Sequence, residues 1–224
     1  MHRTVEGPAA LGEDLPFPAG QPQRRAFPEK LNGLYARLDR PFRRGYRQEH
    51  GYDIWISYSP DMLFWGRHAL VLSHLDVPWG AHKIGPAAPP VRTEQGWLVL
   101  FHAAVMAEPD GGAVLPWKSP RGVVTGMTKV YRPGVMLLDL EDPSKIVGRY
   151  SGPIMEITAP YEKDPFYRPN AIFPCGVIEE PDGEVKIYYG ASDRHIAVAA
   201  ARIGDLVALC LAQGTRTGWR KEHQ

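Results

Sequence analysis

The sequence predicts an all-β fold, an incomplete β-propeller of about three blades. Three stretches follow one pattern, in which a short segment containing Pro leads through a Gly turn into a run of strand-forming residues that ends in a polar side chain. These runs cover residues 34–40, 97–102 and 187–193. Self-similar units repeated at long spacing are typical of propeller blades, whose equivalent positions face one central axis.

The polar side chains that end these runs are expected to meet near the axis. Arg40, His102 and Asp193 close the first, second and third run. They are far apart along the chain, and a radial arrangement of sheets would bring them together. Convergence of a cation, an imidazole and a carboxylate at one point is typical of an active site.

The composition agrees with many short strands joined by turns. The 224 residues include 23 Gly and 22 Pro, two residue types that favour turns. The chain carries 26 basic and 25 acidic residues, so its charge gives no field that would attract nucleic acid or an anionic membrane. The N-terminus has no apolar signal sequence, and no apolar run reaches membrane-spanning length. A cytoplasmic location is therefore expected.

Cysteine and histidine spacing does not predict a disulfide framework or a metal site. The two cysteines, Cys175 and Cys210, are far apart and form no C-x-x-C pair. The histidines show no H-E-x-x-H spacing, so no zinc site is predicted. Cys175 is interpreted as a buried structural thiol.

Further strands are predicted where β-branched and aromatic residues form short runs between turns. These strands cover residues 53–59, 67–72, 134–140, 145–148 and 196–201. Residues 205–211 are predicted to form a short closing helix. The third unit is expected to lack a fourth strand of its own.

The chain is predicted to divide into an irregular segment, 1–26, and a partial propeller domain, 27–224. Residues 1–26 contain several Pro and Gly and show no sustained alternation. A second irregular stretch, 105–130, is interpreted as a long insertion between strands. Three blades are too few to close a ring, so either the chain forms a homo-oligomer that covers its open faces or it is the C-terminal part of a longer protein. The second alternative is favoured.

Eight short segments between residues 27 and 211 resemble one known family in order and approximate spacing. They are Phe-Pro-Glu-Lys at 27–30, Asp-Arg-Pro at 39–41, and the segments 54–61, 82–85, 96–98, 138–145, 169–176 and 187–193. Together they resemble glycoside hydrolase family 130, the β-mannoside phosphorylases, which act on β-1,4-mannosyl-glucose or manno-oligosaccharides. The resemblance implies a five-bladed β-propeller, of which this chain would be the C-terminal part.

The resemblance also implies a reaction, the inverting phosphorolysis of a β-mannoside to α-mannose 1-phosphate. Inverting glycosidases ordinarily need a carboxylic acid and a carboxylate base that activates water. Phosphate is already an anionic nucleophile, so one general acid and a basic cradle suffice. The implied ligands are an oligosaccharide and inorganic phosphate as co-substrate. No metal or organic cofactor is expected.

Six residues of this chain are predicted to bind ligands. By the resemblance, Arg40 and Lys83 contact phosphate and Asp193 contacts sugar hydroxyls. His102 corresponds to a polar position at the rim of the substrate site, and Tyr131 to an aromatic residue near phosphate or the acceptor sugar. Phe173 could stack on a sugar face of the substrate. Taken without the family, Arg40 would more often lie on a solvated basic turn and Asp193 would cap its own turn. Similarly, an aromatic residue before Pro174 is more often part of the core.

The sequence departs from the family pattern at two points. The position of a second phosphate-binding arginine is occupied by Pro22, followed by Gln23, and Arg24 or Arg25 could substitute only if the loop shifts. The family's general acid is an aspartate upstream of residue 27, and Asp14 is a poor match for its context. We therefore expect no catalytic acid in this chain and little turnover by these residues alone.

Two other functions remain compatible with the sequence, and a third is considered but disfavoured. Some family members are β-mannosidases that use water and have lost basic residues of the cradle. A chain without the acid could also be a non-catalytic carbohydrate-binding fragment. A related five-bladed glycosidase would need two catalytic carboxylates in the central funnel, and no such pair can be placed here.

Overall fold

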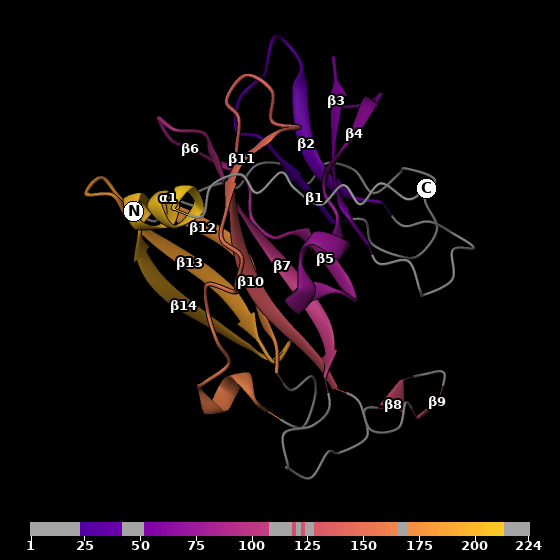
Figure 1. The fold of residues 1–224 in the computed structure, drawn as a ribbon, viewed down its shortest axis with the longest axis vertical. Helices are drawn as coiled ribbons and strands as arrows, with labels where there is room; N and C mark the ends of the chain where they lie inside the picture. The colour runs from indigo at the N-terminus through magenta and orange to yellow at the C-terminus, as the bar shows by residue number, and fades with distance from the viewer. Residues whose placement is uncertain are drawn as a thin grey trace, which may run out of the picture.

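In the described residues, three antiparallel sheets of three or more strands lie side by side, and the α-helix α1 packs against the second and third of them (Figure 1). This computed structural model describes residues 23–41, 52–107, 118–119, 122–123, 128–164 and 170–212. The prediction of an all-β fold is confirmed. The described sheets correspond to three blades of the five-bladed β-propeller on which related structures are built.

The first sheet contains four strands in chain order. They are β1 (Gln23–Ala26), β2 (Tyr35–Arg40), β3 (Ile54–Ser59) and β4 (Gly66–Leu72). Strand β1 corrects the prediction that residues 1–26 are irregular, because it pairs antiparallel with β2 and places Gln23 opposite Arg40. The strand was missed because its sequence is polar. In the structure, Arg24 forms an ion pair on one face of the sheet, and Arg25 donates to a backbone carbonyl on the other face.

The second sheet follows two short 3₁₀ helices, η1 (His74–Asp76) and η2 (Pro78–Gly80). Its main strands run in the order β11-β10-β7-β5, and the two-residue β6 also pairs with β7. Their bounds are β5 (Lys83–Pro86), β6 (Val91–Arg92), β7 (Trp97–Ala107), β10 (Thr128–Leu138) and β11 (Ile146–Arg149).

Strands β7 and β10 are longer than the sequence indicates. They pair without a break from Trp97 opposite Leu138 to Ala107 opposite Thr128. The insertion predicted at 105–130 therefore begins and ends inside these strands, which is a correction. A small hairpin of β8 (Lys118–Ser119) and β9 (Gly122–Val123) lies between them in the sequence.

The third sheet has three strands, as the sequence predicts for the residues described. The 3₁₀ helix η3 precedes these strands and α1 follows them. The bounds are η3 (Pro160–Glu162), β12 (Ile172–Glu179), β13 (Glu184–Ala191), β14 (His195–Arg202) and α1 (Ile203–Leu211). The predicted closing helix is confirmed.

The second sheet is buried on both faces, and its strands separate two hydrophobic cores. Trp97, Val99 and Phe101 of β7 pack with the apolar residues of the first sheet. The alternate residues Leu98 and Leu100 pack with the third sheet and α1. Because apolar side chains of β7 alternate between its two faces, the second sheet packs against both neighbouring sheets. This packing holds the three sheets in radial order.

Candidate functional site

Five side chains from all three sheets meet where the sheets converge. Arg40 ends β2, Lys83 begins β5, His102 lies on β7, Tyr131 on β10 and Phe173 on β12. The Arg40 Nη1 atom lies 3.2 Å from His102 Nε2, and the His102 and Phe173 rings stack with centroids 4.5 Å apart. The Lys83 Nζ atom lies 5.0 Å from the Tyr131 ring centroid. We call these five residues the axial cluster.

Strand register explains why residues so distant in sequence come together. Lys83 and Tyr131 both lie opposite Ala104, so the three residues form one row across the second sheet. The Tyr131 amide donates to the Asn170 carbonyl at 2.9 Å, and Tyr131 forms a β-bridge with Ala171. These backbone contacts join the second sheet to the third beside the cluster.

A buried glutamate, Glu162 of η3, is bonded to the start of this junction. The Glu162 side chain accepts hydrogen bonds from the Tyr189 hydroxyl at 2.9 Å and from two backbone amides. Its backbone carbonyl accepts from the Asn170 amide at 3.0 Å, and the Asn170 carbonyl in turn accepts from Tyr131. Asn170 has a φ of +62°, a conformation that Asn tolerates better than most residues.

Asp193 lies at the edge of the axial cluster. It occupies the turn between β13 and β14, its side chain is exposed, and its φ is +53°. The amide of the preceding Ser192 donates to the Ala171 carbonyl at 2.9 Å. Because Ala171 also bridges to Tyr131, the turn is tied to the cluster through the backbone.

His102 is fully buried and neutral. Burial, and then the charges of Arg40, Lys83 and Arg25, lower the pKa of His102 well below its ordinary value. Since Arg40 can only donate, Nε2 of His102 is the acceptor and Nδ1 carries the proton. Among the residues described, no partner accepts from Nδ1.

The charges around His102 would favour an anion over a cation at this position. Each charged side chain that shifts the His102 pKa is a cation, and the axial cluster itself contains no carboxylate. Burial lowers the pKa of Arg40, which nevertheless stays protonated, as guanidinium groups do in proteins. Partly desolvated cations without a carboxylate among them favour phosphate or another anion.

Arg25 is a member of the site that the sequence offered only as a substitute after a loop shift. Its Nε donates to the Ala87 carbonyl at 2.6 Å and its Nη1 to the Arg24 carbonyl at 2.9 Å. These bonds hold a half-buried guanidinium near enough to His102 to lower the pKa of that imidazole. Strand alternation is the signal that would have found it, because Arg25 and Arg40 lie on the same face of the β1–β2 pair.

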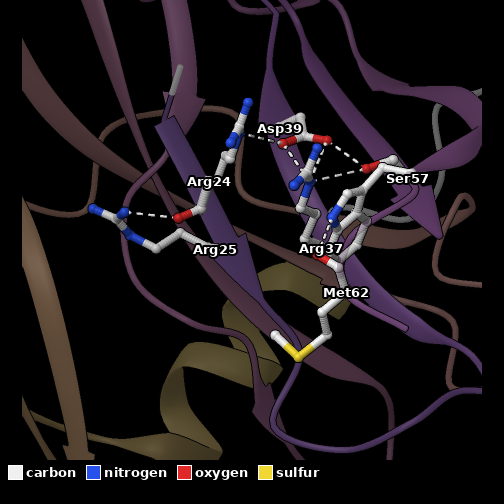
Figure 2. A network of polar contacts seen from close by, with 7 residues as sticks. Arg24, Arg25, Arg37, Asp39, Ser57 and Met62 are labelled. Carbon is white, nitrogen blue, oxygen red and sulfur yellow. Dashed lines mark hydrogen bonds and ion pairs between the residues drawn. The ribbon is translucent and has the colours of Figure 1, made fainter. Parts of the chain in front are cut away.

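Arg24 points away from Arg25, toward a carboxylate on the opposite face of the first sheet (Figure 2). Its Nε lies 3.8 Å from Asp39 Oδ1, and Arg37 Nε lies 3.0 Å from the same carboxylate. Asp39 is buried and also accepts from the Ser57 hydroxyl. This network holds the end of β2, and therefore the backbone that carries Arg40.

Cys175 corrects a prediction, because it is exposed and not a buried structural thiol. It lies at the β12 irregularity between Pro174 and Gly176, where the register with β13 shifts. The extra residue of a bulge is left out of the pairing, so alternation does not bury its side chain.

Neither a metal cluster nor a membrane-spanning helix is found in the described ranges. No three His, Cys, Asp or Glu side chains there are grouped so that they could hold a metal ion. The α-helix of the described chain, α1, has 9 residues, and no helix of those ranges has the length and apolarity needed to span a bilayer.

Acidification is expected to destabilise the fold through two histidines. Burial, followed by the charges of Lys129, Lys83 and His74, lowers the pKa of His82 to about 4, and the pKa of His102 is also depressed. Below the unfolded histidine pKa of about 6.5, the unfolded chain binds more protons than the folded chain, so stability falls as pH falls. Urea midpoints between pH 7 and pH 5 should decrease, and less steeply in His82→Gln. Midpoints that do not change with pH would contradict this.

Known β-mannoside phosphorylases match most of the chain. A family model described as beta-1,4-mannooligosaccharide phosphorylase matches residues 18–212. A 1,2-beta-oligomannan phosphorylase of Thermoanaerobacter sp. (strain X514) is 34% identical over 180 residues, which are 80% of this chain and 50% of the relative. A beta-1,4-mannooligosaccharide phosphorylase of Ruminococcus albus is 31% identical over 182 residues, 81% of this chain and 48% of the relative.

A solved structure matches in fold as well as in sequence. It is the beta-1,2-mannobiose phosphorylase of Listeria innocua in complex with beta-1,2-mannobiose, with a TM-score of 0.68 and 30% identity. The match covers 86% of this chain and 47% of that chain. The chain thus spans about half the length of the curated relatives it matches.

Proposed function

Because the chain belongs to glycoside hydrolase family 130, we propose that it takes part in the phosphorolysis of β-mannosides, with inorganic phosphate as the nucleophile. The observation that carries the proposal is the group of cations at the axial cluster. Arg40, Lys83 and Arg25 come from different strands, Arg40 contacts the buried neutral imidazole of His102, and the charges of all three act on that imidazole. An attacking phosphate requires such positive surroundings.

In the proposed reaction, a phosphate oxygen attacks the anomeric carbon of a β-mannoside. The glycosidic carbon–oxygen bond breaks as the new bond forms, and the leaving oxygen takes a proton from a general acid. The products are α-mannose 1-phosphate and the shortened sugar. Arg40 would hold phosphate through two parallel N–H bonds, and Lys83 would act as a point charge. The reaction so written needs no metal or organic cofactor.

The aromatic part of the axial cluster would form the sugar side of the site. Phe173 and Tyr131 offer ring faces of the kind that pack against the apolar face of a pyranose. The stack of Phe173 on His102 fixes one of these rings. Asp193, exposed at the edge, would accept hydrogen bonds from sugar hydroxyls.

We propose that the general acid comes from sequence outside these 224 residues. Two observations support this, namely the lack of a carboxylate in the axial cluster and the match to about half the length of the relatives. Loss of a positioned acid typically lowers the rate by about 10²–10⁴. The chain alone should then bind phosphate but turn over slowly.

The test follows mannose 1-phosphate release from β-1,2- and β-1,4-mannobiose, with and without phosphate, because relatives named for both linkages match the chain. We expect slow, phosphate-dependent release by the chain and fast release when the upstream half of a family propeller is supplied in the same polypeptide. Equal release of free mannose with and without phosphate would identify a hydrolase. Rapid turnover by the 224 residues alone would refute the external acid.

A further inference from the structure

Tyr52, which the sequence did not single out, lies against one of the two cations that are proposed to bind phosphate. The Arg40 Cζ atom is 5.4 Å from the centroid of the Tyr52 ring. A cation within about 6 Å of an aromatic ring centroid is attracted to the ring face. Tyr52 is half-buried and lies two residues before β3. It is therefore next to the axial cluster without being one of its five members.

Strand pairing explains why Tyr52 lies beside Arg40. Leu38 of β2 is opposite Ile56 of β3, and both side chains pack in the core between the first and second sheets. Because side chains alternate along a strand, Arg40 and Ile54 belong to the same face, each one step farther toward the axial cluster. Tyr52 comes two residues before Ile54, so its ring reaches the Arg40 guanidinium.

The backbone of Tyr52 is tied to the strand that carries Lys83. The Ile84 amide of β5 donates to the Tyr52 carbonyl at 2.9 Å. The next residue, Asp53, accepts from the His74 amide at 2.8 Å, and its Oδ1 atom also lies 2.7 Å from His74 Nδ1. The segment before β3 is therefore bonded both to β5 and to η1.

Both cations that are assigned to phosphate face a tyrosine ring. Arg40 lies over Tyr52, and Lys83 Nζ is 5.0 Å from the centroid of Tyr131. Burial lowers the pKa of Arg40, the nearby Tyr131 and Tyr52 groups oppose this effect, and no described carboxylate contributes to it. A ring face attracts a cation without carrying a full negative charge, so it can orient Arg40 without repelling phosphate.

We propose that Tyr52 is a positioning residue for phosphate binding. Its ring orients the Arg40 guanidinium, and its carbonyl fixes the start of β5, which carries Lys83. The inference rests on the proposed function for the identity of the anion. Tyr52 acts through Arg40, because a guanidinium that is already held in one orientation loses less conformational freedom when the anion binds.

Replacing the ring tests this role, because a substitution at Tyr52 leaves its backbone carbonyl in place. Tyr52→Leu should raise the dissociation constant for inorganic phosphate about five- to tenfold, the effect of losing one partly desolvated cation–π contact. Tyr52→Phe keeps the ring face, so its dissociation constant should stay within about twofold of that of the unmodified chain. Calorimetric titration of the 224-residue chain and its variants with inorganic phosphate measures these affinities.

Tyr35→Leu is the matched control. Tyr35 lies on the same strand as Arg40, and Lys30 Nζ is 4.4 Å from the centroid of its ring, so this change removes a cation–π pair outside the axial cluster. It should leave the phosphate affinity unchanged. Urea denaturation shows whether each variant is folded under the titration conditions. The inference is overturned if Tyr52→Leu binds phosphate as tightly as the unmodified chain, if Tyr35→Leu weakens binding equally, or if Tyr52→Phe binds as weakly as Tyr52→Leu.

NMR spectra recorded without phosphate separate this inference from the proposed function. The side-chain N–H signals of Arg40 are identified by their loss in Arg40→Gln. Protons over an aromatic face resonate upfield, so these signals should move downfield in Tyr52→Leu and stay in place in Tyr52→Phe. Movement in Tyr52→Leu, together with no phosphate binding by the unmodified chain, would support the positioning of Arg40 and refute phosphate as its ligand.

Two results of the NMR experiment would overturn the inference even if phosphate binds. The first is that the Arg40 signals do not move in Tyr52→Leu. The second is a downfield shift in Tyr52→Phe, which can be read even if Tyr52→Leu does not fold.

Discussion

Arg40→Gln is expected to raise the dissociation constant for inorganic phosphate roughly 100-fold. The guanidinium can form two charge-assisted hydrogen bonds to phosphate, and losing such a pair at a partly desolvated site costs about 3 kcal/mol. Gln keeps much of the side-chain volume but neither the charge nor the two-pronged geometry. A ³¹P NMR or calorimetric titration of the 224-residue chain measures the change.

Arg92→Gln is the matched control for that titration. Arg92 is exposed and pairs with Glu29 at 3.1 Å, and its loss should change phosphate affinity less than twofold. If Arg40→Gln binds phosphate as tightly as the unmodified chain, then the axial cluster is not the phosphate site.

Asp39→Ala is expected to lower the free energy of unfolding by about 2–4 kcal/mol. The Asp39 carboxylate is buried beside Arg24 and Arg37, and its removal leaves two partly buried guanidinium groups without their counter-charge. The expected loss is at the lower end of the range for buried pairs because Arg24 is partly exposed. Urea denaturation followed by circular dichroism gives the value.

Asp142→Ala tests whether burial is the reason for that loss. Asp142 pairs with Lys145 at 3.0 Å, but both side chains are exposed, so the change should cost less than about 1 kcal/mol. Equal losses in the two variants would mean that the Asp39 network contributes no more than a surface ion pair.

Much of this fold could be predicted because its strands are short runs of strand-forming residues bounded by turns. The segments around β3, β10 and β14 have β-branched and aromatic runs between turns, and all three are strands in the structure. Of the six predicted site residues, five form the axial cluster, and Asp193 lies at its edge with an exposed side chain. Their roles in binding stay predictions until they are tested.

The features that could not be predicted from the sequence depend on interaction partners from distant strands. β1 has adjacent arginines where a strand would ordinarily alternate, and only the Asp39 carboxylate and the Ala87 carbonyl explain how both side chains are accommodated. For the same reason Arg25 was only an uncertain substitute in the sequence. The start of β10 lies in a stretch that composition marks as a loop, although the strand already begins at Thr128.

The double-sided burial of β7 has a consequence for how the chain folds. β7 and β10 form one continuous hairpin, and consecutive residues of β7 enter different cores. Because the second sheet contributes side chains to both cores, the stabilities of the first and third sheets are coupled through it. The three sheets should therefore unfold as one cooperative unit, and neither outer sheet should stay folded once the β7–β10 hairpin has unfolded. Substitutions at Leu98 and at Val99 would then both destabilise the whole unit, although their side chains enter different cores.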